Sequence, residues 1–196
     1  NYGANNMCQG QRAMIEFAGL NTHKEVHVGH LRNLAIGDTI VRMYKASGCF
    51  TMAADYTNDF GLNVAICLWA MKKFHPGYKP QETERGKWLG EVYMQGTRAL
   101  EENFEYRAEV DTILKAIEAR DVNWMPIFLE TREWSLERFR KVYADLGVHF
   151  DISFYESDIK DEGKEIVADL VKRGIAIKSQ GAVIVGNTGS PGILQT

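Results

Sequence analysis

The chain has 196 residues, of which 45% are hydrophobic and 25% are charged, as in an ordinary globular protein. Its formal net charge of −3 excludes a broad basic face, so a nucleic-acid partner would need a local patch or parts outside this chain. No apolar run reaches the roughly 20 residues of a membrane span, and no signal-peptide pattern opens the chain. Three separated cysteines without metal-ligand spacing favour free thiols, so we expect a cytoplasmic location and no membrane association.

The first part of the chain predicts a strand, a helix and a second strand. Residues 13–19 form a short apolar run with a carboxylate inside it, which predicts a buried strand. From Val28 to about Ala46 apolar residues recur at intervals of three and four, which predicts an amphipathic helix that stops near Gly48. Residues 49–56 predict the next strand and residues 60–74 another helix. Short links between these elements imply a right-handed crossover and a parallel sheet, and therefore an α/β fold.

The rest of the chain predicts a helical insertion followed by a return to the sheet. Residues 75–132 open with "HPGYKP", are rich in Glu, Arg and Lys, and read as helical throughout. Residues 133–196 then predict a helix at 135–146, a strand at 148–157, a helix at 160–172 and a strand at 181–185, which we expect to rejoin the core sheet. Both chain ends are polar and Gly-rich, and the last apolar run breaks off at once, so we expect a piece of a longer polypeptide.

The stretch "NTHKEVHVGHLRN" (21–33) carries the strongest functional pattern. His27 and His30 are three residues apart, so they project from one side of the first helical turn. The free N–H groups and the dipole of a helix N-terminus already favour an anion there, and Gly29 leaves room for a flat ring or a phosphate. This combination suits a nucleoside triphosphate, although each histidine could also be purely structural. A zinc site that includes His23 would need a helix that begins earlier, so we predict no metal site.

The motifs around this stretch resemble those of class I aminoacyl-tRNA synthetases and, among them, the arginyl-tRNA synthetase family. The matching residues are Glu16–Phe17, Asn21, Lys24, His27–Arg32, Gly37–Asp38 and Asp55–Asn63, and the segment 134–158 is similar as well. The sequence departs from the family pattern where Ala18–Leu20 replaces Ser-Ser-Pro, Asp55 replaces Asn and Asn63 replaces Gln. The resemblance covers most of residues 12–196 and implies the N-terminal half of a Rossmann-like catalytic domain.

The resemblance implies that ATP, with Mg²⁺ on its triphosphate, activates L-arginine before transfer to tRNA(Arg). His27 and His30 would hold the phosphates, Gly29 would lie under the nucleotide, and Lys24 would stand in for a lysine of the family's second signature loop. That loop, a Lys-Met-Ser-Lys-Ser type sequence, does not occur in residues 1–196. We therefore expect the piece to be inactive alone, with tRNA held mostly by parts not present here and a monomeric full-length enzyme.

The resemblance assigns four further residues to arginine. Glu16 would hold the guanidinium through a charge-assisted bidentate contact, Asn21 would orient the amino or carboxylate group, and Tyr56 and Asp59 would complete the pocket. A salt bridge from Glu16 to Arg32 or Arg42 remains an alternative, because buried carboxylates are commonly paired.

Three other functions remain open from the residues alone. The chain could belong to another class I synthetase, to an ATP-binding module without catalysis, or to a nucleotidyltransferase, which also uses His-x-Gly-His after a first strand. The long helical insertion and the Asp59-x-Gly61 block argue against the nucleotidyltransferase.

Overall fold

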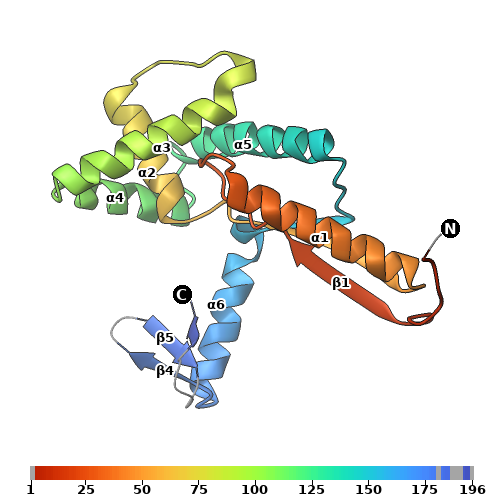
Figure 1. Ribbon diagram of the computed structural model, residues 1–196. Coiled ribbons are helices and arrows are strands. Elements are labelled where there is room, and N and C mark those ends of the chain that lie inside the picture. The colour runs from red at the N-terminus through yellow and green to blue at the C-terminus, as the bar shows by residue number, and fades with distance from the viewer. Residues whose placement is uncertain (1–2, 180–181, 186–191, 195–196) are drawn as a thin grey trace. The chain divides into compact units, whose positions relative to one another are not determined.

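The computed structural model describes residues 3–179, 182–185 and 192–194, and the chain divides into two compact units, residues 1–155 and 156–196 (Figure 1). The first unit contains β1 (Arg12–Phe17), α1 (Val28–Ala46), β2 (Phe50–Thr57), α2 (Leu62–Phe74), a 3₁₀ turn (Glu82–Glu84), α3 (Arg85–Glu102), α4 (Tyr106–Glu118), α5 (Met125–Leu146) and β3 (Ile152–Tyr155). The second unit contains α6 (Glu156–Lys172), β4 (Ala176–Ser179), β5 (Ala182–Val185) and β6 (Gly192–Leu194). Among the described residues, no helix combines the length and the apolar character needed to cross a membrane.

The three strands of the first unit form the predicted parallel sheet, in the order β1-β2-β3. Phe17 pairs with Asp55, and Ala54 pairs with Ile152, so the carboxyl ends of all three strands meet at one edge. The α/β fold and the first crossover are therefore confirmed. The prediction of a buried first strand was wrong, because β1 lies at an edge of this sheet and its side chains alternate between the two faces. Met14 and Glu16 are exposed, whereas Phe17 is buried.

One face of the sheet is covered by α1 and α5. Phe17 and Ala53 from the strands pack in one cluster with Leu34 from α1 and with Leu136 and Phe139 from α5. α1 lies along β1 (Figure 1), and this approach depends on Gly37, because a Cβ at that position would overlap the ring of Phe17. The helix N-terminus is thereby held at the carboxyl edge of the sheet.

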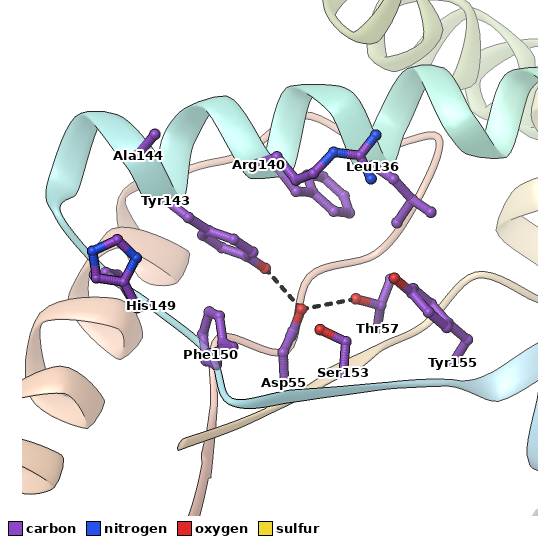
Figure 2. Close-up of a pocket in the computed structure, with 12 residues that line it drawn as sticks. Asp55, Thr57, Leu136, Arg140, Tyr143, Ala144, His149, Phe150, Ser153 and Tyr155 are labelled. Carbon is purple, nitrogen blue, oxygen red and sulfur yellow. Dashed lines mark hydrogen bonds between the residues drawn. The ribbon is translucent and has the colours of Figure 1, made fainter. Parts of the chain in front are cut away.

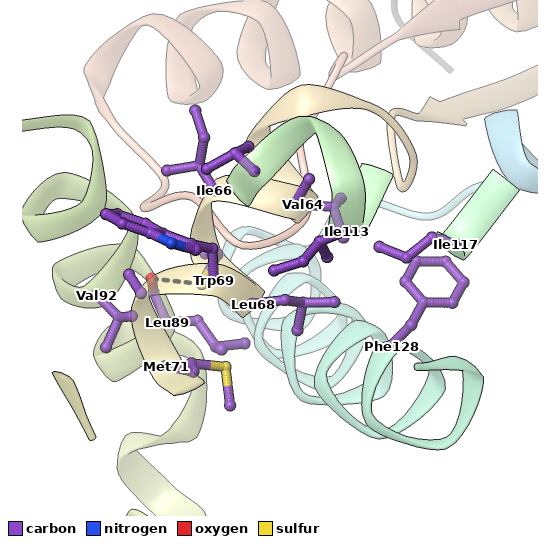
Figure 3. Packing of buried hydrophobic residues seen from close by; sticks show 14 of the residues in the cluster. Val64, Ile66, Leu68, Trp69, Met71, Leu89, Val92, Ile113, Ile117 and Phe128 are labelled. Atoms are coloured by element: carbon purple, nitrogen blue, oxygen red, sulfur yellow. Dashed lines mark hydrogen bonds between the residues drawn. The ribbon is translucent and has the colours of Figure 1, made fainter. Parts of the chain in front are cut away.

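A second core lies within the helices of the first unit (Figure 3). Eight consecutive residues of α2, Val64–Met71, are buried, which requires neighbours on every side of the helix. α3, α4 and α5 supply them, through Leu89, Val92, Val110, Ile113, Ile117, Phe128 and Trp134. The predicted helical segment 75–132 is therefore not a separate body, because its side chains share one core with α2 and with Trp134 of α5.

The segment after β3 differs from the expected return to the core sheet. Only Ile152–Tyr155 pairs with the parallel sheet, while β4, β5 and β6 form an antiparallel sheet in the order β4-β5-β6. Two residues separate β4 from β5 in the sequence, and so short a link can join antiparallel strands but not parallel ones. The predicted helix at 160–172 begins earlier, at Glu156, and the predicted strand at 181–185 is β5. Most of the closing stretch, residues 186–191 and 195–196, lies outside the described residues.

The close approach of α1 to β1 predicts that Gly37→Ala will destabilise the chain. The added methyl group would push the buried Phe17 ring out of its place, and overpacking of this kind costs about 1–3 kcal/mol. Urea unfolding followed by circular dichroism measures the loss. Gly163→Ala in α6 is the matched control, because a Cβ there meets no atom within 4 Å, and that variant should be at least as stable as the parent. Equal stability of the Gly37→Ala variant and the parent would contradict this packing.

Candidate functional site

Two stacked imidazoles cap the N-terminus of α1. His27 is the N-cap residue, its Nδ1 accepts the backbone N–H of Gly29 at 3.1 Å, and His30 Nδ1 accepts the backbone N–H of His27 at 3.2 Å. The ring centroids lie 3.8 Å apart at an interplanar angle of 25°. Because each Nδ1 accepts a hydrogen bond, this network places the proton of each neutral ring on Nε2. The helix therefore starts at Val28, as predicted, with two Nε2–H donors at its N-terminus.

The surroundings of this cap favour the neutral form of His30. Partial burial, together with the nearby charges of His27 and Lys24, lowers the pKa of His30 below its ordinary value. A Cβ on Gly29 would lie 2.9 Å from His27 Cε1 and 3.0 Å from Nδ1, so glycine is needed here for the ring of His27 to fold back on its own turn. Lys24 is partly buried, and its Nζ lies 4.9 Å from the centre of the Tyr93 ring of α3.

His23 stands apart from the other two histidines and is fully buried. Its Nε2 lies 2.8 Å from Thr131 Oγ1, and its Nδ1 lies 3.0 Å from Thr22 Oγ1. Thr131 already donates its proton to the carbonyl oxygen of Ile127, so the threonine oxygen must accept from His23 Nε2–H. Burial lowers the pKa of His23 to about 3, and the ring is neutral at pH 7. Both nitrogens are thus used within the protein, and the described residues contain no cluster of His, Cys, Asp or Glu suited to a metal ion.

A buried ion pair lies next to this histidine. The fully buried Asp59 accepts a hydrogen bond from Nε of Arg132, which follows Thr131 in α5. Arg132 also lies over the Tyr155 ring, 4.3 Å from its centre. The structure therefore places Asp59, which the family resemblance assigned to arginine, against a protein guanidinium that anchors the end of β2 to α5.

Glu16, Asn21 and Tyr56 lie near the carboxyl edge of the sheet. Glu16 pairs with Ala54 in the register, so Glu16 and Tyr56 point to the same face, opposite the one covered by α1 and α5. Asn21 forms an isolated bridge with Asn58, whose side-chain amide donates to Asn21 Oδ1 at 3.4 Å. The expectation that Glu16 is a buried carboxylate was wrong, since the side chain is exposed on the uncovered face.

The turn that directly follows β1 has an unusual backbone. Ala18 and Gly19 both have positive φ angles, 86° and 64°, and Ala18 is buried. Such angles are rare for alanine, and they swing the chain out of β1 toward the N-terminus of α1. Ala18–Leu20, which stand where the family pattern has Ser-Ser-Pro, form this turn.

Asp55 is a buried polar residue that was not among the site residues expected from the sequence. It lies on β2, and its Oδ2 accepts hydrogen bonds from the hydroxyls of Tyr143 and Thr57, each at 3.2 Å (Figure 2). Burial raises the pKa of Asp55 to about 6, and the nearby carboxylate of Glu16 adds to the rise, while the two hydroxyls act against it. The signal in the sequence was the departure from the family pattern, which has Asn at this position.

Comparison with known proteins identifies the family. A family model described as the catalytic domain of class I (R) tRNA synthetases matches residues 2–191. The chain belongs to this family. It is 40% identical over 183 residues to an arginine–tRNA ligase of Bdellovibrio bacteriovorus, which covers 90% of this chain and 31% of that relative. An arginine–tRNA ligase of Borrelia duttonii is 30% identical over 190 residues, which covers 95% of this chain and 32% of that relative.

Solved structures agree on the fold. The arginyl-tRNA synthetase of Thermus thermophilus matches 94% of the chain with a TM-score of 0.74 at 23% identity, and that of Plasmodium falciparum matches all of it with a TM-score of 0.73 at 21% identity. The chain spans about a third of the length of these relatives. The family assignment confirms the resemblance. The histidine cap and Glu16 both lie within the residues that the class I (R) catalytic-domain model matches.

The buried contact between His23 and α5 predicts that Thr131→Val will be destabilising. Valine has nearly the same shape but cannot accept the Nε2–H bond, and a buried donor without a partner costs about 1–3 kcal/mol. Chemical denaturation at pH 7 measures the loss. Thr112→Val is the control, because Thr112 is an exposed helical threonine that also donates to the carbonyl four residues earlier. If the two variants lose the same stability, the His23 contact contributes nothing specific.

Proposed function

We propose that this chain is part of an arginine–tRNA ligase, an enzyme that uses ATP to convert arginine into arginyl-adenylate and then transfers it to tRNA(Arg). The observation that carries the proposal is the pair of Nε2–H donors at the start of α1, together with an exposed carboxylate near the carboxyl end of β1. In the first step the arginine carboxylate attacks the α-phosphate and pyrophosphate leaves. In the second, a ribose hydroxyl at the tRNA 3′ end attacks the adenylate carbonyl and AMP leaves.

The histidine cap would serve the first step by electrostatics alone. Nε2–H groups of His27 and His30 would donate to phosphate oxygens, where the positive end of the α1 dipole also favours negative charge. Donors fixed in a folded turn need no rearrangement as charge builds up on the leaving pyrophosphate. Lys24 would add a positive charge, and Gly29 would let the nucleotide approach the turn. Mg²⁺ would come with ATP, bound through the phosphates.

The arginine site would lie on the uncovered face of the sheet. Glu16 would pair with the guanidinium, Asn21 would orient the substrate, and Tyr56 would line the same face. Asp59 is not included among the arginine-binding residues, because its carboxylate is already paired with Arg132. The remaining two thirds of such an enzyme would supply the opposite wall, the second signature loop and most of the tRNA contacts. We expect that enzyme to be monomeric and cytoplasmic.

The proposed phosphate contacts predict that His27→Ala and His30→Ala will each slow adenylate formation. Loss of one oriented donor should lower kcat/KM by about ten-fold or more. The measurement is arginine-dependent ATP–pyrophosphate exchange in a full-length enzyme that carries this chain. His149→Ala is the control, because that histidine lies on the loop before β3, away from the cap. Unchanged exchange in both cap variants would contradict the assignment.

The proposed guanidinium contact predicts that Glu16→Gln will act on arginine alone. The substitution keeps the shape of the side chain and removes its charge, so KM for arginine should rise about ten-fold or more while KM for ATP changes little. Glu118→Gln, an exposed substitution on α4, should leave both constants unchanged. An equal rise in both KM values for the Glu16 variant would show a structural role instead.

A further inference from the structure

One face of α3 supports the loop that leads into the histidine cap. Gly90 and Tyr93 lie three residues apart on this helix and therefore on the same face. A Cβ on Gly90 would lie 2.5 Å from Glu25 Cγ and 3.1 Å from the backbone nitrogen of Glu25, so the loop runs directly against the helix (Figure 1). One turn further along α3, the ring of Tyr93 receives the ammonium group of Lys24, whose Nζ lies 4.9 Å from the ring centre. The helix thus contacts two consecutive residues of the loop.

The ring of Tyr93 is itself held by the helical core of the first unit. It is partly buried and packs against the cluster of buried residues centred on α2. On the next turn of α3, a Cβ on Gly96 would lie 2.8 Å from Ile66 Cγ2 and 3.1 Å from the carbonyl oxygen of Ile66, so α3 packs directly on α2. A ring anchored in this way can hold a flexible lysine side chain in one position.

The ammonium group of Lys24 lies close to the histidine cap and keeps its charge. Partial burial, and after it the charges of His27 and Lys24, lower the pKa of His30, so the ammonium acts on this ring. In the part of the chain that the structure describes, no carboxylate forms a salt bridge with Lys24. The neighbouring carboxylate, Glu25, has Arg138 of α5 as its strongest charged neighbour. A lysine that rests on an aromatic face is therefore oriented without being neutralised.

We propose that Tyr93 is a positioning residue, whose ring holds the Lys24 ammonium beside the histidine cap, where the triphosphate of ATP would bind. This inference rests on the proposed function and deepens it, since it brings α3 into the ATP site. A free lysine side chain samples many rotamers, and ordering it when ATP binds would cost affinity. The ring removes part of this cost, because the ammonium is in place before ATP arrives. Tyr93 acts through Lys24 and not on ATP itself.

The first test measures the pKa of the His30 ring by NMR titration of the 196-residue chain. Tyr93→Leu releases the ammonium, so the pKa of His30 should rise, as it should in Lys24→Gln, which removes the charge. Tyr93→Phe keeps the aromatic face and should keep the parent pKa. The matched control is Tyr106→Leu, because Tyr106 is a partly buried tyrosine of α4 that packs on the same core and lies under Lys73 of α2.

A second NMR measurement needs no substitution of Tyr93. In the parent chain, the ε-methylene protons of Lys24 should be shifted upfield, because protons above an aromatic face are shielded by its ring current. Circular dichroism checks the folding of each variant. An unchanged His30 pKa in the folded Tyr93→Leu variant, or unshifted Lys24 protons in the parent, would overturn the inference.

A double-mutant cycle tests the role toward ATP, by arginine-dependent ATP–pyrophosphate exchange in a full-length enzyme that carries this chain. Lys24→Gln should lower kcat/KM for ATP about ten-fold or more, and Tyr93→Leu about two- to five-fold, the range of a cation–π contact. The double variant should lose no more than Lys24→Gln alone, because Tyr93 then has nothing to position. Tyr93→Phe and Tyr106→Leu should keep the parent value. Additive losses in the double variant would show a purely structural role for Tyr93 and overturn the inference.

Failure of this inference can be told from failure of the proposed function. If the cap variants His27→Ala and His30→Ala lose exchange while Tyr93→Leu keeps it, the proposed function stands and the inference is overturned. If the cap variants and Lys24→Gln all keep full exchange, the proposed function fails and Tyr93 loses its role toward ATP, whereas the His30 pKa still shows whether the ring holds Lys24.

Discussion

The contact between the buried His23 ring and α5 is the constraint that fixes the proposed site. One turn of α5 supplies Thr131, which accepts the His23 proton, and Ser135, whose hydroxyl accepts the backbone N–H of His23 at 3.0 Å. Arg132, in the same turn, holds Asp59 at the end of β2. The loop that leads into α1 and the end of the central strand are thus tied to one helix. Apart from these ties, the histidine cap depends on the packing of α1 against β1, β2 and α5.

The sequence predicted those features that depend on neighbours along the chain. The start of α1 at Val28 follows from a local apolar period and a local cap, and the first crossover follows from short links. The role of His23 could not be predicted in the same way, because its partners lie 108 and 112 residues away in the sequence. The same holds for Asp59, whose spacing matched a substrate-binding motif while its charge is neutralised by Arg132.

Glu16 shows a different limit of sequence reasoning. An apolar run such as residues 13–19 cannot by itself distinguish a strand covered on both faces from an edge strand covered on one. The register decides, since Phe17 turns toward α1 and Glu16 toward the open face. The separate sheet of the second unit could be inferred only from the two-residue link between β4 and β5, because its strands carry no pattern that excludes the parallel sheet.

Asp55 and His23 respond to acid in opposite directions. The unfolded chain protonates His23 near its ordinary pKa of 6.5 and the folded chain only near 3, so stability falls as the pH drops through this interval. Asp55 has a folded pKa of about 6 against an ordinary 3.8, so its contribution rises as the pH drops from 6 to 3.8 and opposes that of His23. At neutral pH the ionised Asp55 therefore lowers stability. The Asn of the family pattern could accept the same two hydroxyl bonds without this cost.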